Sequence, residues 1–124
     1  MVIWAVLISG VGLAIEPSHA EPPNAGRLLE MYDHELDKGA QEEFELIISY
    51  IAEGFGWANA ELRRRKTPPL YCPPPKLAIT APQLIDILRR AIVEDQPLSN
   101  PLSNQALGFA LLVSLERAFP CPPK

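Results

Sequence analysis

The sequence predicts an all-α fold: a compact array of about four helices, with one disulfide that joins the start of the third helix to the C-terminal tail. Apolar residues recur at spacings of three and four in four segments, which is the helical period. No segment alternates apolar and polar residues as a half-buried strand does. The chain has two cysteines, Cys72 and Cys121, and both lie beside prolines at the edges of the periodic segments. Proline therefore marks the boundaries of helices in this chain.

Residues 1–20 predict a cleaved signal peptide, and residues 21–124 a single mature domain. Residues 2–15 are apolar and uncharged, and residues 18–20 (Ser-His-Ala) have the small-x-small pattern that signal peptidase accepts. The run is shorter than the about 20 apolar residues that a spanning helix needs. No Lys or Arg precedes it, which leaves open a buried N-terminal helix or a misassigned start codon. The destination is then the periplasm or the extracellular space, and of these we expect the periplasm.

The charge of the mature domain excludes some classes of partner. Glu16 is the only Asp, Glu, Lys or Arg in the leader, so 14 of the 15 acidic residues and all 11 basic residues remain, a net charge of −3. A weakly acidic domain is poorly suited to nucleic acid or an anionic membrane surface. We expect no nucleic-acid partner and no stable membrane insertion after cleavage.

The first two helices are expected at residues 24–39 and 41–66. Asn24 is the candidate N-cap of the first helix, and Gly39 its candidate end. The basic run at residues 63–66 lies in the last turn of the second, where cations complement the helix dipole. A binding patch is the alternative interpretation of this run. The apolar face of the second helix comprises Phe44, Ile47, Ile48, Ile51, Phe55, Ala58 and Leu62.

The third and fourth helices each follow a proline-rich segment. Residues 80–83 (Thr-Ala-Pro-Gln) match a capping box, and the helix that they start stops before Pro97. The repeat PLSNPLSN at residues 97–104 predicts a loop and then a helix start with Asn100 as N-cap. Residues 105–119 are apolar on almost every face, which is typical of a helix in the centre of a core, or of one that also forms an oligomer interface.

Cys72 and Cys121 are expected to form one intramolecular disulfide. If the third and fourth helices pack antiparallel, the start of one and the end of the other lie at the same pole. The bond would close a loop of 49 residues, which the chain-entropy model values at roughly 4 kcal/mol. A zinc site and a nucleophilic cysteine are the alternatives. Two cysteines without nearby ligands do not complete a zinc site, and His34 is the only histidine after residue 20.

The sequence shows no catalytic constellation. Glu30 and His34 lie one helical turn apart and could reach one cation, but a histidine among helix-surface carboxylates is usually a solvated, ion-pairing group. There is neither a glycine-rich phosphate loop nor a GxSxG motif. We expect a protein that is not an enzyme and that uses no metal or cofactor.

Residues 48–60, 70–92 and 115–122 carry motifs that, in combination, resemble the Rap/Tai group of immunity proteins associated with type VI secretion. The likeness extends from about Leu28 to Cys121. The matching positions are Tyr50, Ile51 and Gly54; Cys72, Pro74, Leu77, Thr80, Gln83 and Leu84; and Ala118, Phe119, Pro120 and Cys121. Many members have four cysteines. This chain lacks the first pair, whose places fall near Met31 or Tyr32 and near Ile47.

The resemblance implies an exported, helical and often dimeric protein that binds and blocks a peptidoglycan-degrading amidase effector. The expected partners are therefore a peptidoglycan hydrolase and, as a further candidate, a second copy of the chain. The alternative function is a small periplasmic stress-response chaperone that acid activates. An enzyme is the weakest option.

The polar segment at residues 94–104 is the candidate partner-binding tip. It is stiffened by proline and held between two core helices, which lowers the entropic cost of ordering it on binding. An ordinary connector between helices is an equally good interpretation. The candidate binding residues are Gln96, Leu98, Ser99, Asn100, Ser103 and Asn104.

Overall fold

The computed structural model describes residue 12, residues 21–95 and residues 100–123. These residues contain four α-helices, one short 3₁₀-helix and no strand, which confirms the predicted all-α fold. The elements are α1 (Ala25–His34), α2 (Lys38–Arg64), α3 (Ala81–Glu94), η1 (Leu102–Asn104) and α4 (Leu107–Ala118). The predicted leader, apart from residue 12, lies outside the described residues, as do Gln96, Leu98 and Ser99. In the described part of the chain, no helix is both long enough and apolar enough to cross a membrane.

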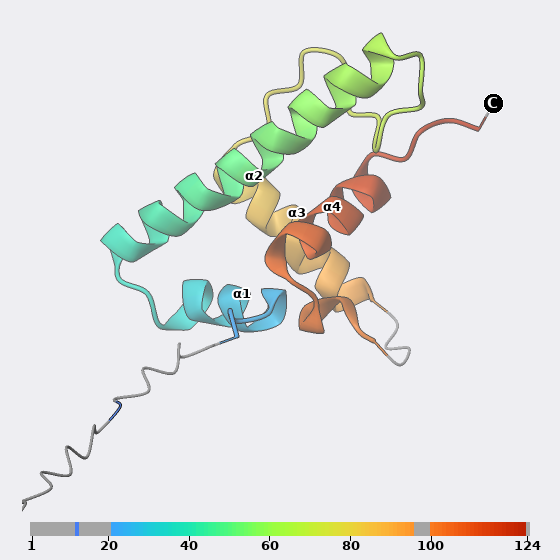
Figure 1. The fold of residues 1–124 in the computed structure, drawn as a ribbon. Helices are drawn as coiled ribbons and strands as arrows, with labels where there is room; N and C mark the ends of the chain where they lie inside the picture. Colours follow the sequence, from blue (N-terminus) through green and yellow to red (C-terminus); the bar gives the residue numbers. More distant parts are fainter. Residues whose placement is uncertain (1–11, 13–20, 96–99, 124) are drawn as a thin grey trace, which may run out of the picture.

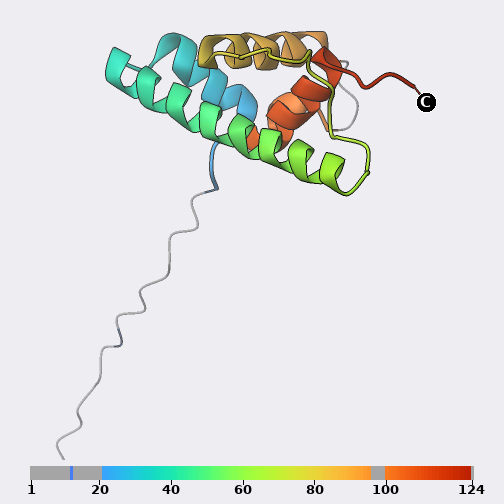
Figure 2. The same ribbon diagram turned by 90° about the horizontal axis from the view of Figure 1, so that it is seen from above.

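The long helix α2 runs along one side of the molecule, and α1, α3 and α4 all lie on the same side of it (Figures 1 and 2). The core forms where α2, α3 and α4 meet. Its largest fully buried apolar side chains are Ile48, Ile85, Leu88, Leu111 and Leu115. An ion pair between Arg89 of α3 and Asp33 of α1 joins two of the helices at the surface.

The boundary between the first two helices differs from the predicted one. Helix α1 ends at His34, and Gly39 lies inside α2 rather than at the end of α1. The reason is Asp37, whose side-chain Oδ1 accepts a hydrogen bond of 2.8 Å from the backbone N–H of Ala40. A capping aspartate favours a helix start, and this outweighs the opposition of one glycine two positions later in the first turn.

The predicted start of the fourth helix is wrong. Asn100 caps no helix; the chain forms η1 and then an extended connection before α4 begins at Leu107. Two hydrogen bonds to groups outside residues 100–106 hold the backbone of these residues away from a continuous α-helix. Leu102 donates to the Asp95 carboxylate at 2.7 Å, and Ala25 donates to the carbonyl of Gln105 at 2.8 Å. The capping box at Thr80 and Gln83, by contrast, is present as predicted.

Helix α1 docks closely on η1 through Gly26. A Cβ atom at Gly26 would lie 2.9 Å from the Cβ of Ser103 and 3.1 Å from its carbonyl oxygen. Only glycine allows this approach without a shift of the backbone. Ser103, one of the predicted binding residues, therefore has a packing role.

We expect Gly26→Ala to lower the free energy of unfolding by about 1–3 kcal/mol, because the added methyl group must displace η1. Gly56→Ala is the matched control, since nothing lies within 4 Å of its Cβ position in α2 and alanine favours a helix by up to about 1 kcal/mol. Urea unfolding followed by circular dichroism measures both. Equal effects of the two substitutions would contradict the close packing at Gly26.

Candidate protein-binding surface

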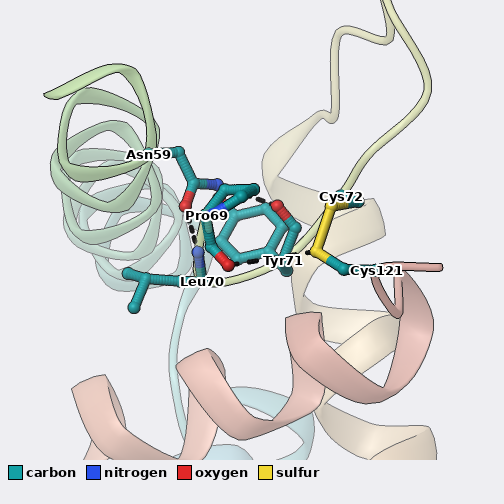
Figure 3. The surroundings of a disulfide bond; sticks show 6 residues. All are labelled: Asn59, Pro69, Leu70, Tyr71, Cys72 and Cys121. Atoms are coloured by element: carbon teal, nitrogen blue, oxygen red, sulfur yellow. Dashed lines mark hydrogen bonds between the residues drawn. A yellow bond between two sulfur atoms is a disulfide. The ribbon is translucent and has the colours of Figure 1, made fainter. Parts of the chain in front are cut away.

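The cross-link between Cys72 and Cys121 is present, as predicted. The two Cα atoms are 4.8 Å apart, and the backbone N–H of Cys72 donates to the carbonyl of Phe119 at 2.8 Å. The bond joins the segment before α3 to the chain just after α4 (Figure 3). It therefore fixes the proline-rich segment and the tail as one rigid edge of the domain.

Asn59 docks the same segment on α2, and the sequence analysis missed this residue. Its side chain is 2% exposed. Its amide nitrogen donates to the carbonyl of Tyr71 at 3.2 Å, and its amide oxygen accepts from the backbone N–H of Leu70 at 2.7 Å (Figure 3). The available signal was a lone carboxamide on the apolar face of a helix that precedes a segment without regular backbone pairing.

We expect Asn59→Ala to lower the free energy of unfolding by about 2–4 kcal/mol, because it leaves the Leu70 N–H and the Tyr71 carbonyl without their partner. Asn100→Ala, at an exposed position, is the control and should change stability by less than about 0.5 kcal/mol. Urea unfolding of the oxidised protein measures both. A loss below about 1 kcal/mol at Asn59 would show that the two hydrogen bonds do not hold the segment.

The described part of the predicted tip is held in place by Asp95. The Asp95 carboxylate accepts hydrogen bonds from the backbone N–H of Leu102 and from the Arg117 guanidinium, at 2.7 and 3.1 Å. The bond from Leu102 is the largest cause that holds the pKa of Asp95 below its ordinary value of 3.8; burial opposes the shift, and Arg117 adds to it. Asn100 and Asn104 are exposed beside this anchor.

Two hollows border residues 100–105. A groove of about 550 Å³ lies between the start of α1, α2 and the approach to α4. It is lined mainly by apolar side chains, of which the largest are Leu28, Phe44, Ile47 and Leu107. Asn104 lies at the edge of the groove. A smaller hollow of about 240 Å³ lies on the other side, where Asn100 and Phe109 contribute to its lining. The structure thus brings Asn100 and Asn104 to the rims of two different concave surfaces.

A second apolar surface lies on α2, on the side that faces away from the core. Four large side chains there are exposed: Leu46 by 54%, Ile47 by 53%, Tyr50 by 63% and Trp57 by 71%. We call this surface the outer face of α2. Exposed apolar side chains grouped in this way on a small domain make this face a candidate interaction surface.

Tyr32 and Ile47 lie in different surroundings. Tyr32 packs against Phe44, with ring centroids 5.3 Å apart, and donates to Glu45 at 2.6 Å. That hydrogen bond is the main cause that raises the pKa of Tyr32 to about 12. Ile47, by contrast, points outward and is half exposed.

Within residues 21–95 and 100–123, no three His, Cys, Asp or Glu side chains gather as a metal site would require. His34 is exposed at the end of α1, and Glu30 forms an ion pair of 3.5 Å with Arg27.

No protein-family model, curated protein or solved structure matches this chain.

We expect the anchor at Asp95 to depend on pH. The folded-state pKa of Asp95 is depressed, so its contribution to stability is fully present above the unfolded-state pKa of about 3.9 and is lost as the pH falls through the folded value. Asp95→Asn should therefore destabilise the domain at pH 7, and the difference from the wild type should shrink below about pH 4. Urea unfolding at both pH values measures it. A difference that does not change with pH would contradict the anchor.

Proposed function

We propose that this protein is an enzyme inhibitor located in the bacterial periplasm. It binds a peptidoglycan-degrading enzyme of the amidase type and occludes the active-site cleft of that enzyme. The observation that carries the proposal is the apolar groove beside Asn104, which lies next to a polar rim on a domain fixed by a disulfide. An apolar hollow with a few polar groups is the usual form of a ligand-binding site, and the groove supports a binding role for the same reason.

The rim is already ordered before a partner binds. Asp95 holds Leu102, the start of α1 holds Gln105, and Ser103 packs on Gly26. The side chain of Asn104 is therefore presented from a fixed backbone, and Asn100 lies two residues before the attached Leu102. A preordered rim loses little conformational entropy on binding, so more of the contact energy is available as affinity.

The chemistry of the rim suits an amidase cleft. Such a cleft must form hydrogen bonds with the amide groups of a peptide substrate, and the side chain of asparagine is itself an amide that both donates and accepts. The predicted leader, the disulfide and the resemblance to the Rap/Tai immunity proteins support the same proposal, since a disulfide persists in an oxidising compartment.

The proposal is tested by expressing the full chain with its leader and isolating the exported, oxidised product together with its bound protein. We expect one stoichiometric peptidoglycan hydrolase, whose activity on purified cell wall is blocked by the bound chain. The double substitution Asn100→Ala and Asn104→Ala should weaken inhibition about tenfold, which is the loss expected when two side-chain hydrogen bonds to the enzyme are removed. Val93→Ala is the control, because Val93 is exposed on α3 and lines neither hollow.

Two outcomes would contradict the proposal. Inhibition unchanged by the double substitution would place the contact outside the rim. Capture of many unrelated proteins, only after acidification, would instead favour the periplasmic chaperone.

A further inference from the structure

A further hollow, of about 320 Å³, lies between α2 and the proline-rich segment before α3. Residues 49, 52, 53 and 56 of α2 line it at helical spacing, and Pro73 and Leu77 of the proline-rich segment line it as well. Leu84 and Leu115, which are buried in the core, also contribute to its lining. The hollow therefore extends from the surface to the core, and we call it the proline hollow.

The segment that borders the proline hollow is fixed before any ligand binds. Asn59 donates a hydrogen bond to the carbonyl of Tyr71, and the disulfide holds the next residue, Cys72 (Figure 3). The N–H of Leu77 then donates to the carbonyl of Pro74 at 3.2 Å, which closes a turn. A binding site whose walls are already in place loses little conformational entropy when a ligand enters it.

Gly56 keeps the proline hollow open. It lies inside α2, where glycine is unfavourable to the helix. Packing within the domain does not require it, because nothing lies within 4 Å of a Cβ atom at this position. A larger side chain would extend into the hollow that Gly56 lines. The glycine therefore preserves a space rather than a contact.

The polar groups at the proline hollow mainly accept hydrogen bonds. Ser49 already donates its hydroxyl proton to the carbonyl of Glu45 at 2.8 Å, so its oxygen can only accept a further bond. Pro73 has no N–H to donate, and the hydroxyl of Tyr71 can accept as well as donate. Among the lining residues that the structure describes, Glu53 is the one charged side chain. Its carboxylate only accepts, and it forms no ion pair with another described residue.

We propose that the proline hollow binds a small molecule with an apolar body and an ammonium group. The apolar body contacts Leu77, Leu84 and Leu115, and the ammonium group lies beside Glu53. An ammonium group has three N–H donors and no acceptor, which matches a set of groups that mainly accept. A ligand carboxylate would instead meet Glu53 as a like charge. The volume of about 320 Å³ lies within the range of small-ligand sites.

The inference does not rest on the proposed inhibitory function. The proline hollow shares no lining residue with the apolar groove or with the hollow beside Asn100. A substitution that fills the proline hollow should therefore leave inhibition of a hydrolase unchanged.

Titration of the exported, oxidised chain with hexylammonium, followed by two-dimensional NMR of the backbone amides, tests for the site. Hexanol and hexanoate are matched probes, because they combine the same alkyl chain with a neutral and a negative head group. We expect one saturable site with a millimolar dissociation constant for hexylammonium, and amide shifts concentrated in residues 49–56 and 71–79. Hexanol should bind about two- to fivefold more weakly, and hexanoate more weakly still.

Two leucine substitutions on α2 test the position of the site. Gly56→Leu should weaken the binding of hexylammonium at least about tenfold, because the alkyl chain loses its place against the apolar walls. Gly54→Leu is the matched control, since nothing lies within 4 Å of its Cβ position either and it does not line the proline hollow. Both substitutions should raise the melting temperature, because leucine favours a helix more than glycine does. Unfolding would then not explain a loss of binding.

Glu53→Gln separates the effect of charge from that of shape. This substitution should lower the affinity for hexylammonium about two- to fivefold and leave the affinity for hexanol unchanged. Glu43→Gln, at an exposed position of α2 outside the proline hollow, is the control and should change neither.

The proposal would be overturned if hexylammonium caused no saturable shift, or if the three probes bound equally well. Undiminished binding to the Gly56→Leu variant would also overturn it. Shifts confined to residues 21–28 would place the ligand in the apolar groove and so contradict the proposed site.

Discussion

The domain depends on how a proline-rich segment is held against its helices. Residues 67–80 form no regular helix or strand, and proline offers no N–H for backbone pairing. From the buried side of α2, the side chain of Asn59 donates to the carbonyl of Tyr71 and accepts from the N–H of Leu70. The disulfide then joins Cys72 to the chain after α4. Without these contacts, the segment that leads into α3 would lose its attachment to α2 and to the chain after α4.

Asp95 has a comparable role at the opposite end of α3. Its carboxylate accepts hydrogen bonds from the backbone N–H of Leu102 in η1 and from the Arg117 side chain of α4. The carbonyl of Gln105, just after η1, accepts a hydrogen bond from the N–H of Ala25 at the start of α1. The groove and its rim result from this arrangement, because α1 and the approach to α4 form two of the groove's walls. Residues 102–105 of the candidate binding surface are thus attached to α1, α3 and α4.

The sequence predicted those features that depend on local patterns. The helical periods, the capping box at Thr80 and the pairing of the two cysteines all follow from neighbouring residues or from the order of elements. The start of α4 was mispredicted because two distant groups, Asp95 and Ala25, decide the conformation of the connection. The groove and the contact of Gly26 with Ser103 could not be predicted, since each joins residues far apart in the sequence. Asn59 was missed because its one signal, a lone carboxamide on an apolar helix face, does not identify its partners. Of the six predicted binding residues, the structure places Asn100 and Asn104 on concave rims and gives Ser103 a packing role.

The placement of α2 at one side of the molecule has an evolutionary consequence. Its inward residues fix the fold, whereas Leu46, Tyr50 and Trp57 point into solvent from the same helix. Selection can therefore replace the outward residues with little effect on folding, because surface substitutions away from special contacts change stability only slightly. Descendants of this chain can acquire or lose an association in few steps while they keep the same core, so the recognition properties of this helix can diverge faster than its architecture.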